Sequence, residues 1–174
     1  MPVTTNVRVR YAETDQMGIV YYANYLVWFE IGRVELLRSL GLAYSQLETD
    51  HQCILPVVEA SCRYKSPARY DDCILIETRP SLLRGSVLKF AYRILRKNVD
   101  DDAPKLLAEG ETVHVVCDAQ LVKKPLPPEH ESALRVMMGT MTAAQAIAGL
   151  EGTLTPAQGD AWLKDSRGEF DENI

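Results

Sequence analysis

Four long segments with strand character follow one another in this chain, and no helical segment separates them. Each is rich in Val, Ile, Leu, Thr and Tyr, and turn-forming residues lie between them, at 54–64, 73–83, 86–96 and 106–117. Strands joined by short turns pair antiparallel, whereas parallel strands need a long crossover that is usually a helix. Residues 5–11 alternate apolar and polar side chains and add a fifth strand. The pattern predicts an antiparallel sheet.

One long helix, residues 22–39, precedes these four strands. Its apolar residues recur at three- and four-residue steps, and charges appear only from Glu30 onward. The first half of the helix is apolar nearly all the way round, and a helix of this kind is buried in the protein. We therefore predict an α+β fold in which a curved five-stranded antiparallel sheet wraps around one central helix. The spacing of Glu30 and Arg33 fits an ordinary ion pair along that helix, and a second short helical piece at 43–48 follows it.

The length of 174 residues suits one domain with a proper core. We expect a domain at 1–139 and a C-terminal extension at 140–174 of unknown function, with helical segments at 129–138, 142–148 and 156–164. The net charge of −5 argues against nucleic acid as a partner. The four cysteines have no CxxC spacing, and the sequence has no signal peptide and no apolar run of membrane-spanning length, so we expect free thiols and a cytoplasmic location.

Several common chemistries lack their motifs. There is no glycine-rich phosphate-binding motif and no GxSxG nucleophile turn. The three histidines, His51, His114 and His130, form no HxxxH or HExxH pair, so we predict no metal site. His51 and Cys53 lie two residues apart without a third, orienting group, which disfavours a Cys–His dyad. His114 fits a packed or hydrogen-bonded strand histidine better than a catalyst.

Asp15 remains as the candidate catalyst. Residues 15–18 have Asp first and Gly fourth, a composition typical of a type I turn, and this reading gives Asp15 no chemical role. The alternative depends on the helix that follows. A helix N-terminus offers unpaired N–H groups and partial positive charge, which stabilise a developing oxyanion. A carboxylate across a small gap from those donors could attack a carbonyl or activate water against it.

The stretch ETDQMGIVYYANYLVWFEIGR resembles the signature of hotdog-fold acyl-coenzyme A thioesterases of the 4-hydroxybenzoyl-coenzyme A thioesterase class, including the bacterial Tol–Pal-associated thioesterases. The segments ARYDD, AEGETVHVVCDA and KKPLP also fit, so the likeness covers about residues 5–128. The resemblance implies the hotdog fold and a homodimer or homotetramer with active sites at subunit interfaces. It also implies hydrolysis of acyl- or aroyl-CoA thioesters, with coenzyme A as part of the substrate and no other cofactor.

Carried over by position, the resemblance makes Asp15 the catalytic carboxylate, as nucleophile or as general base. It makes the backbone N–H of Tyr22 the oxyanion donor. Many relatives carry His at this position, whereas the hydroxybenzoyl-type enzymes carry Tyr, which favours aromatic acyl groups. The residues expected to bind substrate or position it are Gly18, Val20 and Asn24 in the signature, and basic side chains for the phosphates of coenzyme A: Arg63, Lys65 and Arg84, with Arg69 and Lys89 as further candidates.

Two other readings stay open. The same fold could hydrolyse acyl groups carried on acyl carrier protein. The chain could also be a non-catalytic acyl-ligand binder or scaffold that uses the extension at 140–174 as a docking arm. A hotdog dehydratase is disfavoured because no histidine–acid pair lies in the expected context.

Overall fold

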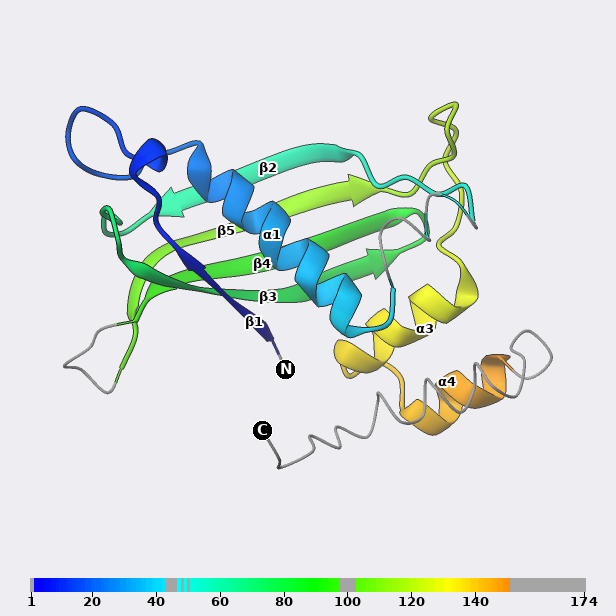
Figure 1. The fold of residues 1–174 in the computed structure, drawn as a ribbon. Helices are drawn as coiled ribbons and strands as arrows, with labels where there is room; N and C mark the ends of the chain where they lie inside the picture. The colour runs from blue at the N-terminus through cyan, green and yellow to red at the C-terminus, as the bar shows by residue number, and fades with distance from the viewer. Residues whose placement is uncertain (1, 43–46, 48, 50, 98–102, 151–174) are drawn as a thin grey trace.

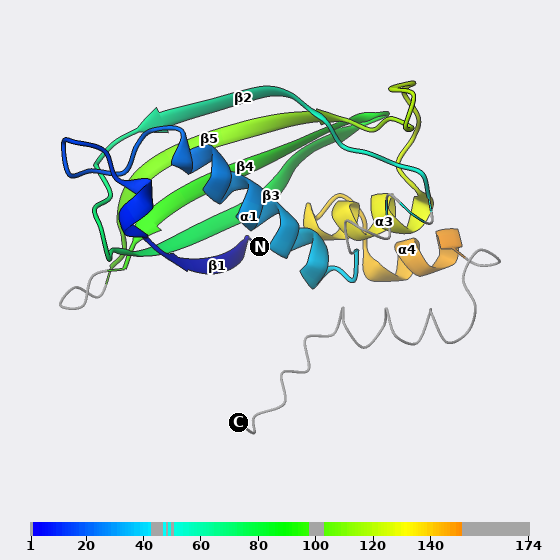
Figure 2. The same cartoon turned by 45° about the horizontal axis from the view of Figure 1, so that its top comes forward.

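The computed structural model describes residues 2–42, 47, 49, 51–97 and 103–150 of the chain. It shows one sheet that curves around a long helix, with two shorter helices at one end (Figures 1 and 2). In chain order the elements are β1 (Val3–Arg8), a 3-10 turn (Tyr11–Glu13), α1 (Asn24–Ser39), β2 (Val57–Tyr64), β3 (Cys73–Arg84), β4 (Val87–Arg96), β5 (Lys105–Val115), α3 (Pro128–Met137) and α4 (Ala143–Leu150).

The sheet has the strand order β1-β3-β4-β5-β2, and every neighbouring pair is antiparallel. The predicted α+β hotdog fold is therefore confirmed, with strand ends shifted by a few residues. The first strand ends at Arg8 instead of residue 11, because the chain turns there into the 3-10 segment Tyr11–Glu13. The strands β1 and β2 form the two edges of the sheet.

Helix α1 packs its buried face onto the concave side of the sheet. Trp28, Phe29 and Leu36 are almost fully buried, and the ring of Phe29 stacks on Tyr92 of β4 with centroids 4.3 Å apart. Gly32 allows the closest approach of helix to sheet, since a Cβ there would overlap the side chains of Thr78 and Ile76 on β3. Large aromatic groups and one absent side chain thus set the distance between the two layers.

The first half of α1 is less buried than its composition predicts. In the single chain Leu26 is 40% exposed, Val27 42% and Tyr22, just before the helix, 60%. One sheet covers one side of a helix, so the prediction of all-round burial is wrong for the chain alone. The predicted Glu30–Arg33 ion pair is also absent from the described residues: Glu30 is exposed, whereas Arg33 is buried.

A buried polar chain lies between α1 and the sheet. The Tyr92 hydroxyl and Thr112 Oγ1 are 2.8 Å apart, and Thr112 Oγ1 is 2.9 Å from His114 Nε2. His114 Nδ1 lies 3.0 Å from the carbonyl of Leu55, which can only accept, so Nδ1 carries the proton and Nε2 accepts from Thr112. Burial, opposed by the bond to Leu55 and helped by the nearby Arg33, lowers the pKa of His114 to about 4. His114 is the hydrogen-bonded strand histidine that the sequence predicts.

The C-terminal helices α3 and α4 pack on each other at the end of the sheet where α1 ends (Figure 1). Ala146 and Leu150 of α4 are buried, so the first part of the predicted extension lies against the domain. The boundary at 139/140 stays a prediction. The predicted helix at 156–164 and the predicted hairpin tip at 100–102 lie outside the described residues, as does most of the helical piece at 43–48.

All four cysteines are free thiols, as predicted, and Cys53 and Cys117 are buried. Within the described ranges, no helix combines the length and the apolar character that crossing a membrane requires.

Candidate active site

Asp15 sits in a tight turn that holds its backbone and one carboxylate oxygen. The Gly18 N–H donates to the Asp15 carbonyl at 3.0 Å, and the Asp15 N–H donates to Ile19 at 2.9 Å. The Met17 N–H donates to Asp15 Oδ1 at 2.8 Å. Gly18 has φ +70°, a conformation that costs other residues strain, which explains glycine at this place. The turn reading of Asp15 is correct, and the turn leaves its second carboxylate oxygen available.

Glu13 fixes both ends of the loop that carries Asp15. Its carbonyl accepts from the Tyr21 N–H at 2.9 Å and from Asn24 Nδ2 at 2.8 Å. Its buried carboxylate accepts from the Arg10 N–H at 2.7 Å, from Arg10 Nη2 at 3.0 Å and from Trp28 Nε1 at 3.3 Å. Burial alone would raise the pKa of Glu13, but the bonds from Arg10 and Trp28 outweigh it and lower the pKa. Glu13 is therefore a charged structural anchor.

The start of α1 leaves the backbone N–H groups of Tyr22 and Ala23 without a protein acceptor in the described part of the chain. The Asn24 N–H donates to the Tyr21 carbonyl at 3.0 Å, so that carbonyl points into the helix. The Tyr21 carbonyl and the Tyr22 N–H belong to the same trans peptide, in which C=O and N–H point in opposite directions. The Tyr22 N–H therefore points out of the helix at its N-terminus. The helix begins at Asn24, two residues later than predicted, yet Tyr22 still offers the expected donor at the positive end of the helix dipole.

Asp15 and Tyr22 line one hollow of about 360 Å³. Its other walls come from the Asp15 loop, the helix start and the end of β2: Met17, Ile19, Val20, Tyr25, Tyr64, Lys65, Ser66 and Pro67. These walls contain neither Cys nor His, so the chemistry of the hollow rests on a carboxylate, phenols, a hydroxyl, an ammonium group and backbone donors. A carbonyl carbon placed between Asp15 and the Tyr22 N–H would meet a nucleophile or base on one side and an oxyanion donor on the other.

Two tyrosines that the sequence reasoning missed hold the helix start in place. The Tyr64 hydroxyl donates to the Tyr22 carbonyl at 3.0 Å, and the Tyr25 hydroxyl accepts from the Ala68 N–H at 3.1 Å. Tyr64 is partly exposed, and the partial burial of its hydroxyl, together with Cys62 and the neighbouring tyrosines, raises its pKa to about 12. Tyr64 is therefore protonated at neutral pH and keeps its donor. The sequence did contain a signal for Tyr64: an aromatic residue followed directly by a basic one, Lys65, at the predicted end of a strand.

Four of the remaining predicted site residues lie in the hollow or support the loop beside it. Val20 and Lys65 line the hollow with Asp15, whereas Gly18 shapes its turn and Asn24 anchors the loop through Glu13. Their predicted substrate contacts stay predictions.

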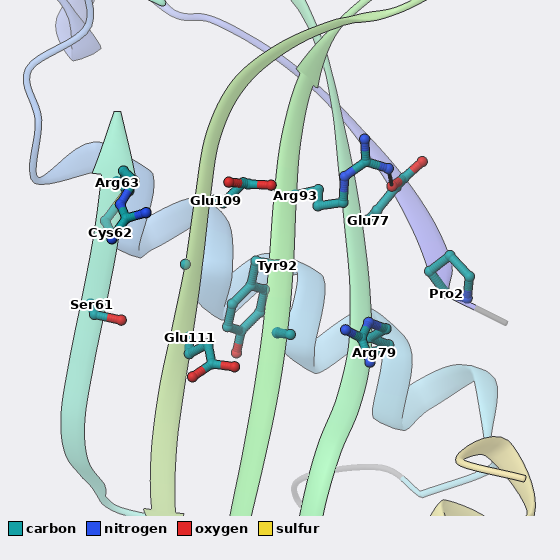
Figure 3. A pocket seen from close by; sticks show the side chains of 12 residues that line it. Pro2, Ser61, Cys62, Arg63, Glu77, Arg79, Tyr92, Arg93, Glu109 and Glu111 are labelled. Carbon is teal, nitrogen blue, oxygen red and sulfur yellow. Dashed lines mark hydrogen bonds and ion pairs between the residues drawn. The ribbon is translucent and has the colours of Figure 1, made fainter. Parts of the chain in front are cut away.

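Arg63 lies in a different hollow, of about 590 Å³, over the face of the sheet that points away from α1 (Figure 3). Charged side chains of both signs line it, among them Glu77, Arg93 and Glu109. Arg84 ends β3, at the end of the sheet where β2 begins, because Arg84 pairs with Val87 and the next strands continue that row to the start of β2. Neither arginine meets Asp15 within one chain.

The chain matches known proteins over most of its length. A family model described as "Thioesterase-like superfamily" matches residues 9–136. Over 117 residues the chain is 38% identical to "Putative acyl-CoA thioesterase YneP" of Bacillus subtilis, which covers 67% of this chain and 80% of that protein. Over 111 residues it is 34% identical to "Acyl-CoA thioesterase YbgC" of Haemophilus influenzae, covering 64% and 76%.

Among solved structures, a mutant of 4-hydroxybenzoyl CoA thioesterase in complex with 4-hydroxybenzoyl CoA superposes with a TM-score of 0.71. The match covers 76% of this chain and 98% of that one at 20% sequence identity. At this identity the likeness is one of fold.

Proposed function

Since the chain belongs to the thioesterase-like superfamily, we propose that it hydrolyses acyl-CoA thioesters to the free acid and coenzyme A, with Asp15 as the catalytic carboxylate. The protein is a thioester hydrolase of the hotdog fold, in line with relatives that are named acyl-CoA thioesterases. One observation carries the residue assignment: Asp15 and Tyr22 line the same hollow, and the Tyr22 N–H has no acceptor among the described residues. The proposed reaction uses no cofactor, because coenzyme A is part of the substrate.

Two routes fit this geometry. As a nucleophile, Asp15 attacks the thioester carbon, the C–S bond breaks, the thiolate leaves and takes a proton, and water then hydrolyses the acyl–Asp15 anhydride. As a general base, Asp15 takes a proton from water while that water attacks the same carbon; the C–S bond then breaks, and the leaving thiolate takes the proton from Asp15. In both routes the Tyr22 N–H receives the negative charge that develops on the carbonyl oxygen. A single turnover in ¹⁸O-labelled water identifies the nucleophilic route when water attacks the Asp15 side of the anhydride, because the label then appears in Asp15 and the product acid takes an unlabelled oxygen from Asp15.

The test of the catalytic residue is Asp15→Asn. An asparagine Oδ1 can still accept from the Met17 N–H and keep the turn, so the change removes the charge and little else. We expect thiol release from acyl-CoA to fall by about 100-fold or more. Asp118→Asn is the matched control, because Asp118 accepts backbone N–H groups in a similar turn, from Gln120 and Val122, outside the hollow. Near-normal turnover by Asp15→Asn would refute the assignment.

We propose an aromatic acyl group as the preferred substrate. The tyrosines at 22, 25 and 64 all border the hollow, and their ring faces suit a flat ring in offset or edge contact. A thioester panel of short, long and aromatic acyl groups tests this preference, and kcat/KM highest for straight chains would contradict it. Faster turnover of thioesters on acyl carrier protein would reassign the carrier. Binding without turnover across the whole panel would favour the acyl-ligand binder.

We propose that the enzyme works as a homodimer joined along β2, with a homotetramer as its extension. β2 is an edge strand in which every residue except the half-buried Cys62 is exposed, including the apolar Val57 and Val58. A long exposed edge with apolar residues is a template for pairing with a second strand. Antiparallel pairing about a twofold axis puts the Tyr64 end of β2, which borders the hollow, beside the start of the partner's β2.

That pairing also suits the predicted coenzyme A contacts. It brings the Arg84 end of one sheet toward the hollow of the other subunit, where Lys65 already lies. Val58→Arg should convert the dimer to a monomer in light scattering and lower activity, whereas Val122→Arg, at an equally exposed valine, should do neither. A monomeric wild-type protein with full activity would contradict the proposal.

The free state of all four thiols supports a location in the reducing cytoplasm.

A further inference from the structure

A second cluster of chemically capable side chains lies far from Asp15. His51 belongs to the segment between α1 and β2, and Glu129 and His130 lie in the first turn of α3. Helix α3 sits at the C-terminal end of α1, whereas the Asp15 loop sits at the N-terminal end (Figure 1). The cluster is therefore separate from the proposed catalytic hollow.

The three side chains are arranged around a common point. Nε2 of His51 lies 3.0 Å from Oε1 of Glu129, and Nδ1 of His130 lies 3.6 Å from the same oxygen. All three ligand atoms lie within 4.8 Å of one another. Metal–ligand bonds of about 2.0 Å in a tetrahedral site place neighbouring ligand atoms about 3.3 Å apart. The two shorter separations bracket that value, so a small inward movement of the His51 side chain would complete one face of a tetrahedron.

His130 is the buried side chain of the cluster whose polar atoms are unsatisfied. It is 6% exposed, and neither of its ring nitrogens has a hydrogen-bond partner among the described residues. A buried polar group without a partner is costly and uncommon in folded proteins. One side of His130 faces an apolar pocket walled by leucines of α1, β4, α3 and the segments between elements, which offers no other donor or acceptor side chain. The ring of His51 lies edge-on to it at 5.1 Å, so the open direction of the cluster is toward Glu129 and His51.

We propose that His51, Glu129 and His130 bind one divalent transition-metal ion of the zinc type. Two imidazoles and one carboxylate form a donor set that zinc accepts, with a water molecule as the fourth ligand. The metal joins the segment before β2 to the first turn of α3 and thereby fastens α3 to the domain. Lys124 Nζ donates to the His51 carbonyl at 2.8 Å and already holds that segment in place. The Asp15 hollow lies at the other end of α1, so the metal takes no part in the proposed thioester hydrolysis.

The sequence predicted no metal site because the ligands are not adjacent in the chain. Spacing rules detect pairs such as HxxxH, which lie on one face of a helix. Here His51 is brought to Glu129 and His130 by the fold alone, through the contact of α3 with the end of the sheet.

The experiment uses the full chain, freed of metal by a chelator and dialysed. Calorimetric titration with zinc should show one ion per chain. At free zinc about a hundredfold above the Kd, the Tm should rise by about 5 to 10 °C. Cobalt(II) should give the visible absorption of a four-coordinate site. Turnover of the best acyl-CoA substrate should be the same with and without metal, which also separates this result from any failure of the Asp15 assignment.

Variants identify the ligands. His51→Gln and Glu129→Gln should each weaken zinc binding by about 100-fold or more, because losing a metal ligand costs at least as much as losing a group that only orients one. His51 and Glu129 are only partly buried, so both variants should fold. Glu131→Gln is the matched control: it makes the same change in the same helix, at a residue paired with Arg135 at 2.8 Å instead of the cluster. The proposal is overturned if zinc leaves the Tm unchanged, or if both ligand variants bind zinc as tightly as Glu131→Gln, which would indicate the free thiols.

Discussion

His114 makes the stability of this fold depend on pH in a defined direction. The ring is fully buried and neutral, with Nδ1–H donating to Leu55 and Nε2 accepting from Thr112. Its pKa of about 4 in the folded protein compares with an ordinary value of 6.5. The unfolded chain therefore takes up a proton at a pH where the folded chain does not. The stabilisation is complete above about pH 6.5, is lost progressively as the pH falls, and is gone below about pH 4.

The size of the effect follows from the shift in pKa. Each pKa unit corresponds to about 1.4 kcal/mol, so the displacement from 6.5 to about 4 gives a loss of about 3 kcal/mol of unfolding free energy between neutral pH and pH 4. That is a large part of the total stability of a domain of this size. Within that range the unfolded state binds up to one proton more than the folded state at this side chain.

Urea unfolding at half-unit steps from pH 7.5 to 4 measures this proton uptake. In the wild type, the slope of the unfolding free energy against pH should exceed that of His114→Gln by up to about 1.4 kcal/mol per pH unit. All other ionisable side chains are common to the two proteins, so their contributions cancel in the difference. Because His114→Gln breaks the polar chain, an NMR titration of the wild-type ring gives an independent reading: the His114 ring signals should stay those of the neutral form at pH 5.

Equal slopes in the two proteins, or a His114 ring that is protonated at pH 6 in the folded state, would refute this reasoning. Either result would mean that the buried polar chain admits a charged imidazolium, for example through solvent.

Two substitutions probe the packing of α1. Gly32→Ala should lower the unfolding free energy by about 1 to 3 kcal/mol in urea titrations, because the new methyl group overlaps the sheet. Gly149→Ala, in α4 with open space around it, should be neutral or stabilising by up to about 1 kcal/mol, and equal effects at both sites would contradict the close approach of α1. Tyr64→Phe removes the hydroxyl that donates to the Tyr22 carbonyl and should lower kcat about fivefold, the factor that corresponds to one lost hydrogen bond. Tyr70→Phe, at an exposed tyrosine, is its control, and an unchanged kcat in Tyr64→Phe would show that the helix start needs no such support.

The sheet could be predicted because its signals are local. Strand segments carry alternating burial, as in β3 and β4, and turn residues such as Gly85, with φ +57°, separate them. The absence of helices between the strands then fixed the antiparallel topology. The Asp15 turn and the helix after it could be placed for the same reason.

The exposed start of α1 could not be predicted from periodicity. Apolar character all round a helix indicates that every side is covered, yet it does not say whether the same chain provides the cover. Leu26 and Val27 are exposed here because the sheet reaches only the opposite side of the helix.

The basic residues show a second limit, and one that strand geometry could have removed. Neighbouring residues in a strand point to opposite faces. Tyr64 borders the Asp15 hollow, so Arg63 had to point to the other face, where the structure places it. The role of Glu13 was out of reach, because it depends on where a backbone carbonyl points and on Trp28, fifteen residues further along.

The anchoring of the Asp15 loop by Glu13 has an evolutionary consequence. The bonds that hold the loop run to Arg10, Tyr21, Asn24 and Trp28, and none of these four residues lines the hollow. The side chains that meet the acyl group can therefore mutate without moving the catalytic loop. A lineage built on this framework can change its substrate by drift in a few wall residues while it inherits the reaction unchanged.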